Sequence, residues 1–337
     1  MRHVIGMGVP GYATQPKASG DIWIKSVMDE YPGIVILGPT ASGKSRLGFA
    51  LAGLFQGEIV SCDALQVYRQ MDIGTAKASL AEQTLVPHHM LNIRYPDEDF
   101  SAGDYQRIAR QAILEIRQRG HLAFVIGGSG FYLRALIEGL FEGPGRSESL
   151  RMRMRRIIQR KGPRILHRAL QRVDPPSAAR IAEKDAERII RAYEVYLVSG
   201  KSMSWWQEQP RDALRGFRWL KLGIDLPREQ LYRNIDRRVE EMFQAGFLEE
   251  VRWLLGKFPR SSQAFKAIGY RQVAEYLEGT ISLEQALEET RKESRHYAKR
   301  QLTWLRSDRN ILWLDGQTGF DELRQKASAL ISGFLKP

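Results

Sequence analysis

Residues 33–45 read Gly-Ile-Val-Ile-Leu-Gly-Pro-Thr-Ala-Ser-Gly-Lys-Ser. An apolar run rich in β-branched residues leads directly into the G-x-x-x-x-G-K-[ST] pattern of a phosphate-binding loop. Apolar residues then recur at helical spacing, and a stop signal, Gly57, follows; these residues are Leu47, Ala50, Leu51 and Leu54. The stretch therefore predicts a strand, a loop and a helix in that order.

The chemistry of this loop is the binding of a phosphate compound. Glycines let the backbone turn its N–H groups inward toward an anion, and the helix N-terminus adds partial positive charge. Lys44 supplies a full charge, and the Ser45 hydroxyl can hold Mg²⁺. The predicted diphosphate- or nucleotide-binding residues are Gly38, Pro39, Thr40, Ala41, Ser42, Gly43, Lys44 and Ser45. The pattern does not identify the ligand, and most chains with this loop bind ATP or GTP.

The overall composition points to a soluble globular protein with a polyanionic partner. The 337 residues suffice for one elaborated α/β domain or for two domains, and 43% hydrophobic with 27% charged content is ordinary. The net charge of +12 is not ordinary for an enzyme of small metabolites, and it makes nucleic acid the leading partner. A single cysteine, Cys62, excludes an internal disulfide and a cysteine-based zinc site.

The chain shows no targeting or membrane segment. No apolar stretch approaches the ~20 residues that a membrane span needs. The first 27 residues contain neither a signal-peptide core nor an Arg/Ser-rich transit pattern. We therefore expect a cytoplasmic protein without a membrane partner, acting as a monomer, with residues 1–29 as a loose extension rich in Gly and Pro.

Asp63 is the first candidate for chemistry. It follows the predicted strand 58–61, and the carboxyl ends of parallel strands form the site, so it should lie near the phosphate loop. The next predicted strand, 122–126, runs into Gly127-Gly-Ser129, where a phosphate-loop hydrolase usually has an Asp that helps to hold Mg²⁺. Residues 64–77 show no clean apolar period, which favours a functional loop over a regular element.

The pair His88-His89 raises the possibility of a metal site. Adjacent side chains on a strand or loop diverge, however, and no third ligand is spaced nearby. We favour a structural or substrate-orienting role for the pair.

The composition changes from Gly143 onward. Residues 146–172 contain ten Lys or Arg but only one acid, Glu148, above a helical apolar stripe. Solvated helix faces usually mix both signs, so this ratio favours a surface for a polyanion. Residues 143–215 are predicted to form a basic, all-helical insertion that binds RNA.

The remaining chain completes the sheet. A strand over 217–224 is followed by helices near 228–244, 247–257 and 283–307, a closing strand over 311–314 and a short last helix. The helix 283–307 carries cations with interleaved aromatic residues and forms a second basic surface. We predict a P-loop NTPase-like parallel sheet flanked by helices, built from residues 30–142 and 216–337 and interrupted by the insertion.

An ordered set of motifs carries a family resemblance. Besides the phosphate loop it comprises Asp63 with 66–68, Asp72-Ile-Gly-Thr-Ala-Lys77, His88-His89, Phe100-Ser-Ala-Gly-Asp-Tyr105, Gly127-Gly-Ser-Gly-Phe-Tyr132, Arg188 with Arg191-Ala-Tyr-Glu194, Ala267-Ile-Gly-Tyr-Arg-Gln272 and Tyr297-Ala-Lys-Arg-Gln-Leu-Thr-Trp304. The chain resembles the tRNA isopentenyltransferase family, the tRNA dimethylallyltransferases of bacterial type, over roughly residues 33–315. The phosphate loop alone is unspecific, whereas the ordered set is highly specific.

The resemblance implies an enzyme that moves a dimethylallyl group from dimethylallyl diphosphate to the exocyclic N6 amine of an adenosine. That adenosine lies 3′-adjacent to the anticodon in tRNAs that read codons starting with U, and diphosphate is released. Lys44, the loop amides, Mg²⁺ on Ser45 and Arg238 would stabilise the charge that grows on the diphosphate. Asp63 would accept the proton of the amine as general base. Arg233 and Arg237 on the same predicted helix leave the choice of arginine open.

The resemblance also implies the RNA contacts. The target base must be flipped out of its stack, and Ser129 would hydrogen-bond the flipped base or its neighbours. The expected tRNA-binding residues are Asp63, Ala64, Leu65, Gln66, Ser129, Arg151, Lys184, Asp185, Ala186, Glu187, Arg188, Lys266, Ala267, Ile268, Gly269, Tyr270 and Arg271. The anticodon stem-loop would be the part of the tRNA that is bound.

Two departures from the family pattern stand out. The family commonly has Asp-Ser where this chain has Asp63-Ala64, which removes a hydroxyl and leaves the RNA contact at position 64 open. It also has Gly-Gly-Thr where this chain has Gly-Gly-Ser129, which keeps the hydroxyl.

Three alternative functions stay open. A dimethylallyltransferase of free AMP needs no RNA-gripping insertion. A small-molecule or nucleoside kinase would turn over ATP on an acceptor alcohol, and the missing strand-end Asp argues against it. A non-enzymatic RNA-binding module would not depend on Asp63.

Overall fold

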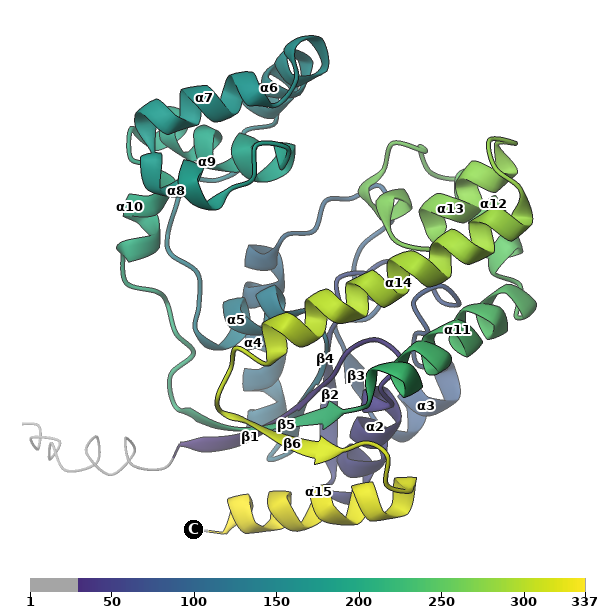
Figure 1. Cartoon of the computed structure of the whole chain (residues 1–337). Coiled ribbons are helices and arrows are strands. Elements are labelled where there is room, and N and C mark those ends of the chain that lie inside the picture. The colour runs from purple at the N-terminus through teal and green to yellow at the C-terminus, as the bar shows by residue number, and fades with distance from the viewer. Residues whose placement is uncertain (1–29, 337) are drawn as a thin grey trace, which may run out of the picture.

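A six-stranded sheet forms the centre of the molecule in the computed structural model, which describes residues 30–336 (Figure 1). The predicted extension, residues 1–29, lies outside the described residues. The strand order is β3-β2-β4-β1-β5-β6, and every neighbouring pair is parallel. The strands are β1 (Tyr31–Leu37), β2 (Gly57–Cys62), β3 (His88–His89), β4 (Leu122–Gly127), β5 (Phe217–Asp225) and β6 (Ile311–Asp315).

Helices cover both faces of this sheet and extend beyond it. They are α2 (Lys44–Leu54), α3 (Leu80–Leu85), α4 (Ala102–Gln118), α5 (Gly130–Ile137), α6 (Glu148–Lys161), α7 (Arg164–Val173), α8 (Pro175–Arg180), α9 (Ala186–Ser199), α10 (Met203–Glu208), α11 (Arg228–Gln244), α12 (Phe247–Leu255), α13 (Tyr270–Leu277), α14 (Leu283–Leu305) and α15 (Phe320–Leu335), with a short 3₁₀ turn at Gln263–Lys266. The predicted class, a parallel sheet flanked by helices with a helical insertion, is confirmed. No helix among residues 30–336 is both long and apolar enough to cross a membrane.

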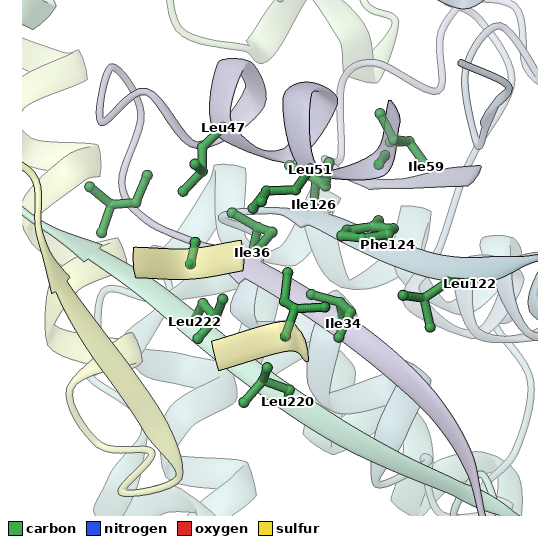
Figure 2. Close-up of a cluster of buried hydrophobic side chains, with 14 of the residues drawn as sticks. Ile34, Ile36, Leu47, Leu51, Ile59, Leu122, Phe124, Ile126, Leu220 and Leu222 are labelled. Carbon is green, nitrogen blue, oxygen red and sulfur yellow. The ribbon is translucent and has the colours of Figure 1, made fainter. Parts of the chain in front are cut away.

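Alternate residues of the buried strands build one core on each face of the sheet. On one face Ile34, Ile36, Phe124 and Leu222 pack against α2 and α15. Figure 2 shows these strand residues beside Leu47 and Leu51 of α2. On the other face Val35 and its equivalents pack against α4, α5 and the end of α14. Because both faces are covered, β1 and β4 read as nearly continuous apolar runs, which made them predictable. β2 is buried along its whole length although it contains Glu58 and Ser61.

Two helical groups stand away from the sheet (Figure 1). The helices α6 to α10 have small cores of their own, around Leu170 and Ile189, and are tied to the sheet domain by residues 138–147 and 209–216, which are not helical. The helices α12 and α13 share a third core with residues 67–71 of the loop after β2. The active-site cleft lies at the carboxyl edge of the sheet and is lined by the loops after β1 and β2 together with α11 and α14.

Some predicted boundaries were wrong. The first helix ends at Leu54, and Gly57 is instead the first residue of β2. A glycine is needed there, because a Cβ at Gly57 would lie 2.5 Å from the Phe124 ring. The helix α13 was not predicted, because it is only 8 residues long and begins at the Gly269 turn. The last helix, α15, has 16 residues and is not short.

Candidate active site

The phosphate loop links the end of β1 to the start of α2. Ala41 (φ 61°) and Gly43 (φ 88°) adopt the left-handed conformation that lets successive N–H groups turn toward one point. Gly38 permits the tight curl, because a Cβ there would lie 2.4 Å from the Ser42 hydroxyl. The loop is thus a concave surface of backbone donors at a helix N-terminus, which suits an anion.

Lys44 is a cation without an acidic partner. Its Nζ donates to the Pro39 carbonyl (3.2 Å), and it makes no ion pair with any residue in 30–336. Burial, together with the nearby Arg238 charge, lowers the pKa of Lys44 to about 8. A poorly hydrated cation of this kind gains more from an arriving anion than a solvated one does.

Arg238 of α11 is the arginine that reaches the loop. Its guanidinium donates to the Thr40 hydroxyl (2.8 Å) and to the Thr75 carbonyl (3.4 Å), and burial lowers its pKa. Its neighbours are turned elsewhere: Arg233 donates to Gln230, and Arg237 pairs with Glu241 at 3.6 Å. The geometry therefore selects Arg238 among the three arginines left open by the sequence.

Asp63 follows β2 and faces the same cleft as Lys44 and Arg238. Its Oδ1 accepts the Leu65 N–H (2.8 Å), which fixes the carboxylate at the strand end. The cleft has a volume of about 1260 Å³ and is also lined by Ser45, Gln66 and Tyr297. The Asp63 carboxylate thus shares a cavity with Lys44, Arg238 and the phosphate loop.

Steric crowding explains why β4 ends in a glycine and not in an Asp. Gly127 pairs with Cys62 across β2 and β4. A Cβ at Gly127 would lie 2.1 Å from the Cys62 carbonyl oxygen, so no side chain fits there. Asp63 is the carboxylate that the two neighbouring strand ends provide.

Two residues of α14 reach into the site from the opposite side. Tyr297 lines the cleft, and burial, with a contribution from Asp63, raises the pKa of its hydroxyl to about 12. One turn further on, Gln301 accepts the Thr40 N–H (2.8 Å) and donates to the Gly128 carbonyl (3.0 Å). Both residues belong to the motif 297–304 that supports the family resemblance, but the sequence did not place them in the active site, although their spacing of four puts them on one helix face.

Comparison with known families agrees with this geometry. Residues 66–308 match the family model described as IPP transferase. A curated relative from Koribacter versatilis (strain Ellin345), named tRNA dimethylallyltransferase, is 48% identical over 282 residues, covering 84% of this chain and 92% of the relative. The chain belongs to the IPP transferase family. It is therefore a transferase.

Solved structures of this family have the same fold. The tRNA isopentenylpyrophosphate transferase from Bacillus halodurans is 37% identical, with a TM-score of 0.67 over 90% of this chain and 96% of that one. A eukaryotic dimethylallyltransferase described as acting on tRNA is 28% identical, with a TM-score of 0.74 over 90% of this chain and 79% of that one.

The residues expected to contact RNA near the cleft fall into two groups. Ala64, Leu65, Gln66, Lys266, Ala267 and Ile268 line the cleft, as Asp63 does. Gly269 and Tyr270 are buried instead, and the Tyr270 hydroxyl donates to the Glu250 carboxylate (2.6 Å). The expectation that the Tyr270 side chain touches RNA is therefore corrected, because its ring lies in the core under the loop. Arg271 is half-buried beside Glu275 (3.3 Å).

Arg151, which was expected to contact RNA, forms an ion pair inside the insertion. Its guanidinium binds Glu194 through two nitrogens, both at 2.9 Å, and the side chain is 13% exposed while that of Glu194 is fully buried. Arg191 binds the same carboxylate (2.8 Å). Arg151 thus holds the insertion together from within instead of standing free on its surface.

The segment 184–188 has exposed cations at both ends. Lys184 and Arg188 are exposed, Asp185 caps α9 by accepting the Arg188 N–H (3.2 Å), and Ala186 begins that helix. Burial would raise the pKa of Glu187, but Arg155, Arg151 and Lys266 hold it below its usual range. Lys266 itself lines the cleft.

The helix α14 contributes less free charge than its sequence suggests. Arg291 binds Glu240 and Arg295 binds Asp236 (2.7 Å), so both fasten α14 to α11. Lys299 and Arg300 remain exposed. The second basic surface is correspondingly narrower than predicted.

The pair His88-His89 forms the edge strand β3 of the sheet. His89 binds Glu58 (2.6 Å), which also pairs with Arg119 and His121 (both 2.8 Å). Burial would raise the pKa of Glu58, yet Arg119 and the two histidines lower it to about 2. Among residues 30–336 no group of three or more His, Cys, Asp or Glu side chains is arranged to hold a metal ion.

Proposed function

We propose that this IPP transferase family member transfers a dimethylallyl group from dimethylallyl diphosphate to tRNA. The acceptor would be the N6 amine of the adenosine 3′-adjacent to the anticodon, in tRNAs that read codons starting with U. The single observation that carries the proposal is the cleft in which Asp63 faces Lys44, Arg238 and the phosphate loop. The relatives are named tRNA dimethylallyltransferase, and this name supports the substrate class.

The phosphate loop would hold a leaving group instead of a group to be hydrolysed. The C–O bond between the allylic carbon and the diphosphate breaks while the new C–N bond forms, and the bond electrons leave with the diphosphate. Lys44, Arg238 and the loop N–H groups are donors fixed around the position where that charge grows. Preorganised donors in a poorly hydrated site typically contribute most of the stabilisation of such a transition state.

Asp63 would accept the proton that the amine loses as it attacks. Its Oδ1 accepts the Leu65 N–H, and its second oxygen would accept the proton from the adenine amine in the cleft. General base catalysis of this type contributes about 10²–10⁴ in rate. The target adenosine would enter by flipping out of its stack, at a cost of a few kcal/mol.

Magnesium would bind at Ser45. Its side chain is exposed at the cleft, and its hydroxyl makes no hydrogen bond with the described residues 30–336. Mg²⁺ is usually held by one or two protein oxygens together with substrate phosphates, so this donor fits. When bound, the ion would neutralise part of the diphosphate charge.

The tRNA would lie over Gln66, Ser129, segment 184–188 and Lys266, with exposed cations of the insertion on its backbone. Residues 143–215 are thus proposed as a tRNA-binding insertion, and the chain is proposed to act as a monomer. Binding through lysines and arginines implies affinity that falls steeply with salt.

The direct test supplies isotopically labelled dimethylallyl diphosphate and unmodified tRNA, and then maps the labelled nucleoside. We expect label on the N6 amine of the adenosine next to the anticodon, with one diphosphate released per transfer. Label in another nucleoside would contradict the site, and ATP turnover on an alcohol without any transfer would favour a kinase.

A further inference from the structure

Glu250 of α12 holds a turn of the loop that follows β2. Its Oε2 accepts the N–H groups of Asp72 (2.9 Å) and Ile73 (2.7 Å), and its Oε1 accepts that of Gly74 (3.2 Å). The Tyr270 hydroxyl donates to the same Oε1 (2.6 Å). A single carboxylate thus receives four donors, three of them from consecutive residues of one turn.

Aromatic side chains of α12 and α13 also pack against the turn, which limits its freedom to move. A Cβ at Gly74 would lie 2.4 Å from the Phe247 ring and 2.5 Å from the Tyr270 ring. The Thr75 side chain is buried and donates to the Met71 carbonyl (2.6 Å). The position of the turn is therefore set by α12 and α13, not by the sheet.

The next backbone group of this turn faces the active site. The Thr75 carbonyl accepts the Gln66 amide (3.2 Å) and the Arg238 guanidinium (3.4 Å). Gly74, Thr75 and Ala76 line the same cleft as Asp63 and Lys44. Within residues 30–336 the Arg238 guanidinium makes one other hydrogen bond, to the Thr40 hydroxyl, so the Thr75 carbonyl accepts one of its two hydrogen bonds.

We propose that Glu250 is a positioning residue for the reaction. It fixes the turn at residues 72–76, and the Thr75 carbonyl then holds the Arg238 guanidinium toward the diphosphate and the Gln66 amide toward the acceptor side. The part of this inference that concerns transfer rests on the proposed function, whereas the part that concerns diphosphate does not. Misplacement of a catalytic group by about 1 Å can cost up to about a hundredfold in rate.

The substitution Glu250→Gln tests the inference with little change in volume. An amide replaces one acceptor oxygen by an N–H₂ group, which then faces N–H donors of the turn. The matched control is Glu249→Gln, which alters the neighbouring exposed glutamate of the same helix. The first readout is the affinity for inorganic diphosphate with Mg²⁺, measured by calorimetry, with thermal unfolding measured alongside.

We expect Glu250→Gln to weaken diphosphate binding about tenfold and Glu249→Gln to leave it unchanged. The deciding step is a double-mutant cycle with Arg238→Lys, because groups that act through one another are not additive. In the Arg238→Lys background, Glu250→Gln should weaken binding by less than about twofold. The same fold loss in both backgrounds, or no loss in either, would overturn the inference.

Two further measurements keep the test decisive. If Glu250→Gln does not fold, Tyr270→Phe removes one of the four donors and enters the same cycle with the same expected non-additivity. Single-turnover transfer to an anticodon stem-loop should fall in parallel with diphosphate affinity. If the unmodified protein binds diphosphate but transfers nothing, the proposed function fails, while the diphosphate cycle still decides the role of Glu250.

Discussion

The cleft and the helical insertion use positive charge in opposite ways. In the cleft, Lys44 and Arg238 make no ion pair with any described residue, and burial lowers the pKa of both side chains. In the insertion, Arg151, Arg155 and Arg164 bind Glu194, Glu187 and Glu183. The other cations of segment 146–172 that make no ion pair within residues 30–336 are exposed, namely Arg153, Arg156, Arg160, Lys161, Arg168 and Arg172.

This difference shows that a count of cations does not reveal their function. Unpaired, poorly hydrated cations lower the stability of the fold until an anion arrives, which is typical of a catalytic site. Arg151 supports the structure around the buried Glu194 carboxylate, whereas Arg155 and Arg164 form ion pairs at the surface. The exposed cations of the insertion are the ones available to RNA. The experiments below test this division, beginning with the largest expected effect.

Removal of the Asp63 carboxylate tests whether the cleft performs the chemistry. We expect Asp63→Asn to lower single-turnover transfer by about 10²–10⁴, because the amide cannot accept the proton. Affinity for tRNA, measured by filter binding, should stay within about twofold, since the side chain keeps its size and most charge contacts remain. A parallel loss of tRNA affinity would make Asp63 a structural residue instead.

Replacing one arginine from each region by Met tests directly whether Arg151 stabilises the fold and Arg238 supports the reaction. Arg151→Met should destabilise the protein by about 3 kcal/mol, because it leaves Glu194 buried with one partner fewer. Arg238→Met should leave stability unchanged or raise it by about 1 kcal/mol while it lowers activity at least tenfold. Chemical denaturation of both variants measures these changes, and loss of stability in Arg238→Met would contradict the comparison.

The pH dependence of the Arg151→Met effect provides a control. Burial would raise the pKa of Glu194, but Arg151, Arg191 and the Ser147 N–H lower it from 4.5 to about 2. The stabilisation is therefore fully present above pH 4.5 and is lost as the pH falls toward 2. The stability difference between the variant and the unmodified protein should shrink over that window.

Much of the fold and the centre of the site could be predicted from local sequence. The buried strands read as apolar runs, and the phosphate loop sits between a strand and a helix. Because the carboxyl ends of parallel strands meet at one edge, Asp63 could be placed beside the loop without any tertiary information. The insertion was visible because ten cations against one acid are rare on a solvated helix.

The rest depends on packing between distant segments. The choice of Arg238 over Arg233 and Arg237 depends on how α11 turns against the loop, which three arginines on one helix do not reveal. Arg151 is turned inward because Glu194, 43 residues away, is buried beneath it. Gln301 and Glu250 look like ordinary polar residues of helices, and their roles become visible only when their partners are in place.

The lowered pKa of Lys44 makes diphosphate binding depend on pH. The ammonium is fully charged well below pH 8 and loses its proton as the pH rises past that value, so its contribution to the affinity for inorganic diphosphate should be constant at lower pH. Above about pH 8, affinity should fall by up to about tenfold per pH unit. Diphosphate itself also titrates, so its affinity is measured by calorimetry for both the unmodified protein and Lys44→Met. The difference between the two pH profiles is then due to Lys44, and identical profiles would contradict the assignment.

The smallest expected effect concerns the exposed cations of α6. Arg153, Arg156 and Arg160 recur at spacings of three and four and form an exposed stripe on one face of that helix. Replacing all three by Gln should reduce the slope of log affinity for tRNA against log salt by about 2–3. Diphosphate affinity should not change. An unchanged slope would place the RNA on another face of the insertion.

The central claim is that the unpaired cations of the cleft hold a departing diphosphate while the insertion delivers an RNA adenosine to Asp63. The most direct measurement compares single-turnover dimethylallyl transfer to an unmodified anticodon stem-loop with transfer to free AMP, both at saturating dimethylallyl diphosphate. We expect the stem-loop to react at least about 10³ times faster, a preference of about 4 kcal/mol. Equal rates on AMP would contradict the account, because the insertion would then have no part in presenting the substrate.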